Sequence, residues 1–185
     1  MSRRKNKKVG LDFISDATLR RKVSDAIETT SFLYLKRNEK GVSAGFASEI
    51  RRMEILYAAS IIEAVLLFLF KKRNESMTKM DYKDVHILPA SYQQSAASQF
   101  VVAKQSKVLR QDRELMLDNL LDFFSEKRVI KNSLKTKIDK ARRVRNTFHL
   151  SKSRKGIRCG AKAVDSANDA VIGTFAVARR LLISK

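Results

Sequence analysis

The sequence is poor in the residues that build turns, disulfides and metal sites. Its 185 residues include one proline, six glycines, one cysteine, two histidines and no tryptophan. Few prolines and glycines favour long helices over a turn-rich β architecture. Cys159 has no second cysteine to pair with, which predicts a reducing, cytoplasmic location. Two histidines and one cysteine are too few for a zinc site, so we expect no metal and no cofactor.

The chain also lacks a long uninterrupted apolar run. Its most apolar stretch, Ile55 to Phe70, contains Ser60 and Glu63 and falls short of the roughly 20 residues that span a bilayer. The opening segment MSRRKNKKVG is basic, but the apolar region of a secretory signal does not follow it. These features predict a buried core helix and no membrane partner.

Acidic residues are missing from two segments, and this absence creates most of the net charge of +20. Residues 1–9 hold five basic residues and no acid, and residues 127–162 hold 14 basic residues with Asp139 as their only acid. Residues 10–126, by contrast, hold 17 basic and 16 acidic residues. Concentrated positive charge attracts phosphate backbones, which favours an RNA-binding protein. The alternative interpretation is a solvated basic face with a disordered tail.

Apolar periodicity predicts an all-α bundle of about five helices. We expect a flexible basic arm over 1–10 and a single helical domain over 11–185. The predicted helices cover 16–40, 45–73, 112–129, 133–150 (with Ser133 as its N-cap) and 165–184. Residues 74–98, which contain His86 and Pro89, read as an irregular connection, and 151–162 as a basic loop. Residues 99–110 fit either a short β-hairpin or a helix.

The predicted helix over 133–150 places charged groups on its apolar side. With Leu134 at zero on a helical wheel, the apolar stripe holds Ile138 at about 40°, Ala141 at about 340° and Phe148 at about 320°. Arg145 falls at about 20°, in the middle of the stripe, and His149 at about 60°, on the same side. An arginine at such a position needs a partner or a cleft. Glu63, within the most apolar stretch of the chain, has the same need, which predicts a Glu63–Arg145 pair between two helices. Glu63 at a helix edge, reaching water, is the alternative.

The segment 142–149, Arg-Arg-Val-Arg-Asn-Thr-Phe-His, resembles the signature helix of the HEPN superfamily. The motif of that superfamily is an arginine, commonly followed by asparagine, with a histidine after four to six intervening residues. Here Arg145-Asn146 precedes His149 with three residues between the arginine and the histidine, whereas Arg143 and Arg142 precede it with five and six.

The resemblance implies a helical, often dimeric domain, and in many members a metal-independent endoribonuclease of toxin–antitoxin or defence systems. His149 would then be the general base or acid, Arg145 would stabilise the charge that develops on the phosphate, and Asn146 and Glu63 would orient these groups. The residues that would hold the RNA backbone are Arg142, Arg143, Lys152, Arg154, Lys155 and Arg158. A homodimer would join two motif helices in one composite site.

Three other functions remain open at this stage, one of which is a peripheral membrane protein held by its basic tail and apolar helix. The chain could be a non-catalytic nucleic-acid-binding subunit, in which the Glu63–Arg145 pair is structural. It could also be a protein-interaction subunit whose basic face meets an acidic partner, such as an antitoxin or a nucleotidyltransferase. The basic neighbours of Cys159 could lower the pKa of its thiol, although an incidental cysteine is the simpler interpretation.

Overall fold

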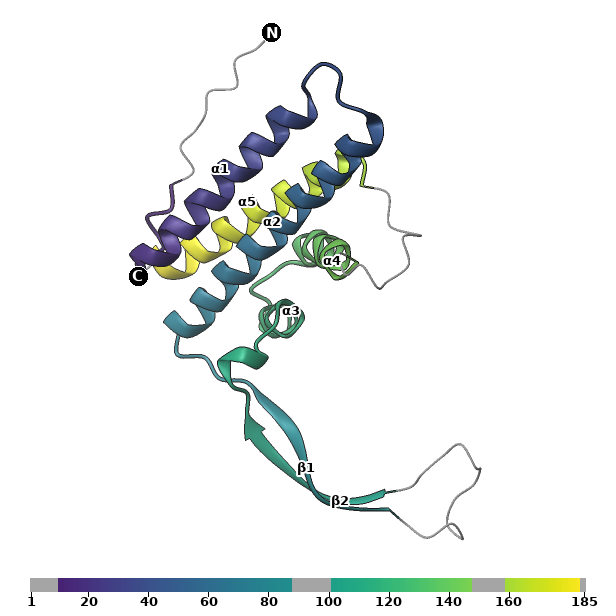
Figure 1. The fold of residues 1–185 in the computed structure, drawn as a ribbon. Helices are drawn as coiled ribbons and strands as arrows, with labels where there is room; N and C mark the ends of the chain where they lie inside the picture. The colour runs from purple at the N-terminus through teal and green to yellow at the C-terminus, as the bar shows by residue number, and fades with distance from the viewer. Residues whose placement is uncertain (1–9, 88–100, 148–158, 184–185) are drawn as a thin grey trace. The chain divides into compact units, whose positions relative to one another are not determined.

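The computed structural model describes residues 10–87, 101–147 and 159–183. Within these ranges it contains five α-helices, one short 3₁₀ turn and two antiparallel strands (Figure 1). The predicted mainly helical class is therefore confirmed. The helices are α1 (Ala17–Arg37), α2 (Ala44–Lys72), α3 (Leu117–Glu126), α4 (Asn132–Asn146) and α5 (Ala161–Ile183), the 3₁₀ turn is η2 (Asp112–Glu114), and the strands are β1 (Thr78–Ile87) and β2 (Val101–Leu109). The chain divides into two compact units, a helical unit of residues 1–73 and 116–185 and a hairpin unit of residues 74–115.

Helix α2 is the centre of the helical unit, as the sequence predicts. It packs against α1, α3, α4 and α5, and its apolar half is buried nearly all round, with Ile62, Leu66 and Leu69 at 0% exposure. In Figure 1, α1, α2 and α5 run alongside one another, and α3 and α4 lie across them. By length and composition alone α2 could cross a membrane, but 56% of its most apolar 18-residue window is buried within the protein, as in the core helix of a folded domain.

Side-chain caps fix the beginnings of the first two helices. The N–H of Leu19 donates to Asp16 Oδ1 over 3.0 Å, and the N–H of Phe46 donates to Ser43 Oγ over 3.2 Å. Each cap satisfies one backbone donor that the first turn of a helix leaves without a partner. The predicted starts of both helices, which rest on apolar periodicity, lie within one residue of the observed starts.

The later helix boundaries differ from the predicted ones. Helix α3 begins at Leu117, after the separate turn η2, so residues 112–129 do not form one helix. Lys131, not Ser133, occupies the N-cap of α4, and Ser133 lies in its first turn. Helix α5 begins at Ala161, inside the predicted basic loop. The predicted continuation of α4 over 148–150 lies outside the described residues.

The hairpin unit corrects the prediction of an irregular connection over 74–98, because β1 occupies Thr78–Ile87. Strand β1 pairs with β2 over Val101–Leu109, which confirms the hairpin alternative for that segment and makes His86 a strand residue rather than a loop residue. A bulge interrupts the register between Lys83 and His86. Asp84, within the bulge, has a φ of +52°, which aspartate adopts more readily than most residues.

Candidate functional site

Arg145 and Glu63 form the ion pair that the sequence predicts. Arg145, in the last turn of α4, donates from Nη1 to Glu63 Oε2 of α2 over 2.6 Å. The two side chains are 26% and 21% exposed, so the pair is half-buried rather than enclosed. Ile138, Ala141 and Val144 are the buried residues of α4, and Arg145 lies at the edge of their stripe, not at its centre. This edge position lets the guanidinium reach both the carboxylate and water.

Glu63 also binds the beginning of α3. Its Oε1 accepts the N–H of Leu117 over 2.9 Å, and Leu117 is the first residue of that helix. A carboxylate at a helix N-terminus satisfies a free donor and interacts favourably with the helix dipole. Glu63 of α2 thus contacts both α3 and α4. The hydrogen bond to the backbone of Leu117 could not be predicted from the sequence.

A small pocket of about 130 Å³ opens beside this point. Its lining includes two arginines of α4 together with Asn146, the last residue of that helix. The lining residues are Glu63, Met116, Leu117, Asp118, Arg142, Arg145 and Asn146. The N–H donors of arginine and asparagine side chains, close to the N-terminus of a helix, are groups that bind phosphate or carboxylate. The structure therefore brings together Glu63, Arg142, Arg145 and Asn146 from the predicted site.

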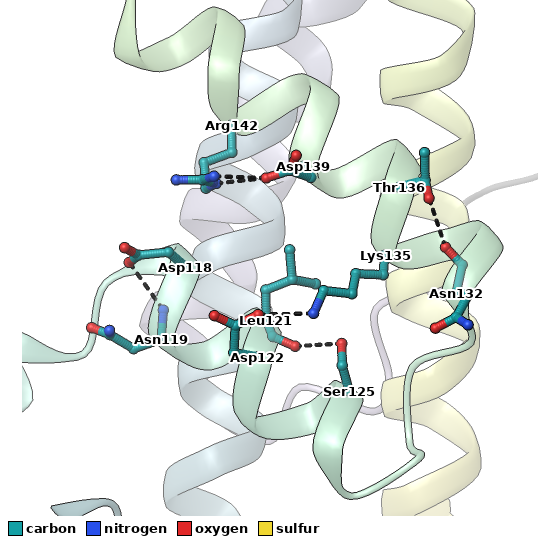
Figure 2. A network of polar contacts seen from close by, with 10 residues as sticks. All are labelled: Asp118, Asn119, Leu121, Asp122, Ser125, Asn132, Lys135, Thr136, Asp139 and Arg142. Atoms are coloured by element: carbon teal, nitrogen blue, oxygen red, sulfur yellow. Dashed lines mark hydrogen bonds and ion pairs between the residues drawn. The ribbon is translucent and has the colours of Figure 1, made fainter.

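Asp139 holds two of the predicted RNA-binding residues. Its Oδ1 accepts from Arg142 Nε and Nη2 over 3.0 and 2.7 Å, and its Oδ2 lies 2.8 Å from Arg143 Nε. Figure 2 shows the Arg142–Asp139 bonds on α4. The hydrogen bonds from Arg142, followed by the charges of Arg142 and Arg143, hold the pKa of Asp139 below its usual range. Arg142 is thereby oriented at the pocket, whereas Arg143 remains 69% exposed.

Two further lysines of α4 pair with carboxylates from neighbouring helices. Lys135 lies 2.9 Å from Asp122 of α3 (Figure 2), and Lys137 lies 2.8 Å from Asp169 of α5. These are exposed pairs, which contribute little to stability. Lys140 is exposed and has no carboxylate within 4 Å among the described residues. The positive charge of α4 is thus partly balanced locally, a feature that net-charge counting along the chain does not capture.

The second half of the predicted site lies outside the described residues. His149, the predicted general base or acid, falls there, as do four of the predicted backbone-binding residues, Lys152, Arg154, Lys155 and Arg158. Their roles stay predictions.

Other reactive side chains do not form a second site in the described ranges. Burial raises the pKa of the Cys159 thiol, with the charges of Arg52 and Arg51 opposing the effect; its sequence neighbour Arg158 lies outside the described residues. His86 is exposed on β1. No group of three or more His, Cys, Asp and Glu side chains that could hold a metal ion occurs among the described residues.

Sequence reasoning missed a second buried carboxylate, Glu54 of α2. Its side chain is 1% exposed and lies 3.1 Å from Nε of Arg37, itself 8% exposed. Burial raises the pKa of Glu54, with the Arg37 charge opposing it. Glu54 also lines a pocket of about 510 Å³ among α1, α2 and α5. The signal was readable: Glu54 precedes Ala58, Ile61 and Val65 at helical spacing, so it shares a buried face with them.

No family model, curated protein or solved structure matches this chain. The fold and site define a mainly helical protein with a half-buried arginine–glutamate pair beside a small polar pocket.

Proposed function

We propose that this protein binds RNA and that the pocket beside Arg145 receives a phosphate group of the strand. The observation that carries the proposal is the anchored but accessible guanidinium of Arg145. Glu63 accepts from its Nη1 alone, and a guanidinium has five N–H donors. Among the described residues the remaining donors have no protein acceptor, which leaves them for a ligand.

The surroundings of Arg145 favour a phosphate over a neutral ligand. Arg142 lines the same pocket and its orientation is fixed by Asp139. Planar guanidinium groups bind phosphate oxygens bidentately, with more geometric specificity than lysines provide. The segment that follows the helix, residues 148–162, adds five basic residues and no acid, so the local field attracts a polyanion toward this end of α4.

RNA cleavage without a metal ion is a second candidate function. It is favoured by the Arg145–Asn146 pair at the pocket, with His149 three positions beyond Asn146 in the sequence. In this reaction His149 takes the proton of the ribose 2′-OH, the 2′-oxygen attacks the adjacent phosphorus, and the bond from phosphorus to the 5′-oxygen breaks as that oxygen takes a proton from water. Arg145 stabilises the charge on the phosphorane oxygens. The products are a 2′,3′-cyclic phosphate and a 5′-OH, and DNA, which lacks the 2′-OH, is not cut.

The binding proposal is tested by comparing Arg145→Gln with Lys140→Gln. Both substitutions remove one positive charge from α4, but Lys140 does not line the Arg145 pocket. RNA affinity, measured by fluorescence anisotropy, is expected to fall about tenfold for Arg145→Gln, the equivalent of one charge-assisted contact, and less than about threefold for Lys140→Gln. Equal losses in the two variants would indicate a diffuse field and no pocket.

Cleavage is tested by incubating labelled RNA with the protein in EDTA and identifying the ends of the products. The proposed chemistry predicts 2′,3′-cyclic phosphate ends, their loss in His149→Ala with RNA binding retained, and an uncut DNA of the same sequence. Uncut RNA at stoichiometric protein would leave RNA binding as the function and exclude the nuclease. Such an outcome would not affect the comparison of Arg145→Gln with Lys140→Gln.

A further inference from the structure

The β1–β2 hairpin has two chemically different faces. Partners across an antiparallel pair point to the same face, and neighbours along a strand point to opposite faces. Met80 lies opposite Lys107 and Tyr82 opposite Gln105 on one face, whereas Lys83 lies opposite Lys104 on the other. The alternation in this part of the hairpin therefore separates large apolar side chains from most of the charged ones.

The bulge in β1 allows the separation of apolar and charged side chains to continue to the far end of the hairpin. It adds one residue to β1, so that Ile87 pairs with Val101, and Val101 shares a face with Gln105 and Lys107 because all three lie an even number of residues apart on β2. If β1 alternated without the bulge, Ile87 would point to the same face as Lys83. The resulting surface, here called the apolar face, comprises Met80, Tyr82, Ile87, Val101 and Leu109.

The side chains of the apolar face are exposed in the part of the chain that the structure describes. Its five side chains are between 51% and 66% exposed, although monomeric proteins rarely leave a contiguous set of large apolar side chains uncovered. A two-stranded ribbon is at best marginally stable by itself and gains stability from a second layer. The other face carries most of the charged residues: Lys79, Asp81, Lys83 and Lys104 lie on it with His86 and Val102.

Charge decides what kind of molecule can cover the apolar face. Lys107 is the sole charged residue on that face among the register pairs that the structure describes. Residues 74–115 hold six basic and five acidic residues, a net charge of +1, which leaves +19 of the total of +20 in the rest of the chain. A polyanion gains little from an apolar, nearly uncharged surface. Two copies of this protein, which repel each other elsewhere, meet with the least repulsion at the hairpin.

We propose that the apolar face docks against the same face of a second copy of this chain. A two-fold axis brings each patch onto its own equivalent, and two twisted ribbons stacked face to face form the two layers of a small β-sandwich, about 10 Å apart. Because the face packs against its own equivalent, every copy of the chain supplies both sides of this contact. The apolar face and the Arg145 pocket share no residue, so Arg145→Gln is expected to leave the dimer unchanged.

Two adjacent valines provide a matched test. Val101 lies on the apolar face and Val102 on the opposite face, and they are 52% and 56% exposed. Val101→Glu and Val102→Glu therefore make the same chemical change, at nearly equal exposure, on the same strand. We expect sedimentation equilibrium of the full-length protein, at an ionic strength that screens its net charge, to give a dimer for the wild type and for Val102→Glu, and a monomer for Val101→Glu.

Each other result overturns the proposal. A monomeric wild type at about 100 μM shows that no such dimer forms, and a dimeric Val101→Glu variant places the contact elsewhere. Equal dissociation of both variants attributes the effect to hairpin stability, which backbone hydrogen exchange of β1 and β2 measures independently. Flotation of a monomeric wild type with phospholipid vesicles, abolished by Val101→Glu alone, assigns the apolar face to lipid.

Discussion

At the residue scale, the candidate site depends on charges that cannot remain alone in apolar surroundings. Arg145 and Glu63 were predictable as a pair because each interrupts an apolar stripe, and their 2.6 Å contact confirms that prediction. Asp139 was not recognised as a partner of Arg142 and Arg143, although their spacing of three and four residues within one helix is the spacing of helical ion pairs.

Asp139→Asn tests that missed contact through pH. The pKa of Asp139 is held below its ordinary value of 3.8, so its ionised form stabilises the fold above that pH, and the contribution is lost as the pH falls through the folded pKa. Urea unfolding should show Asp139→Asn to be about 1 kcal/mol less stable than the wild type at pH 7. The difference should shrink as the pH is lowered below that ordinary value.

The control for this prediction is Asp25→Asn, which removes a carboxylate from the exposed side of α1. It should behave like the wild type at pH 7. A deficit for Asp139→Asn that persists unchanged in acid would mean that the aspartate acts by packing rather than by its charge.

At the element scale, apolar periodicity was enough to place the first two helices. The starts of α1 and α2 were predicted within one residue from this periodicity, whereas their caps, Asp16 and Ser43, were not recognised in advance although both residue types are common at that position.

The first strand was missed because the bulge between Lys83 and His86 interrupts its alternation. Met80 and Tyr82 alternate with charged residues, but beyond the bulge the apolar positions shift by one, to Val85 and Ile87. Pro89 also contributed to the error, because a proline in the segment favoured the prediction that all of residues 74–98 are irregular.

The contact between α4 and α5 is sensitive to the size of residue 173. A Cβ on Gly173 would lie 2.7 Å from Cδ1 of Leu134, whereas a Cβ on Gly45, also helical, would meet nothing within 4 Å. Gly173→Val should therefore lower the free energy of unfolding by about 2 kcal/mol through overpacking, and Gly45→Val should change it by less than about 0.5 kcal/mol. Chemical denaturation of both variants measures the difference, and equal values would show that Leu134 moves aside at no cost.

At the scale of the whole molecule, the distribution of charge along the chain is the property that the sequence reveals best. The backbone fold by itself says little about it. The excess of 18 charges in residues 1–9 and 127–162 is fixed by composition. How much of it acts on a ligand depends on pairs such as Lys135–Asp122, which require coordinates. The nearly neutral character of the hairpin unit, in contrast to the strongly basic remainder, was likewise readable from the sequence once its boundaries were known.

Salt dependence tests whether phosphates are contacted directly. A strand that contacts about four phosphates releases counterions with a slope near −0.7 per phosphate, so RNA affinity should fall about 50-fold between roughly 50 and 200 mM KCl. Anisotropy titrations at several salt concentrations measure the slope. A loss of less than about twofold would favour an acidic protein as the partner of the basic face.

The most direct test of the central proposal is the RNA affinity of the double variant Glu63→Gln/Arg145→Gln. This double substitution preserves the net charge of the protein, so the overall electrostatic field is unchanged. The amide carbonyl introduced at position 63 can still accept the N–H of Leu117, so the start of α3 keeps its hydrogen bond. If the guanidinium of Arg145 binds a phosphate, affinity should fall about tenfold while the melting transition remains cooperative. An undiminished affinity in the folded double variant would contradict the proposal and reduce the pair to a structural contact.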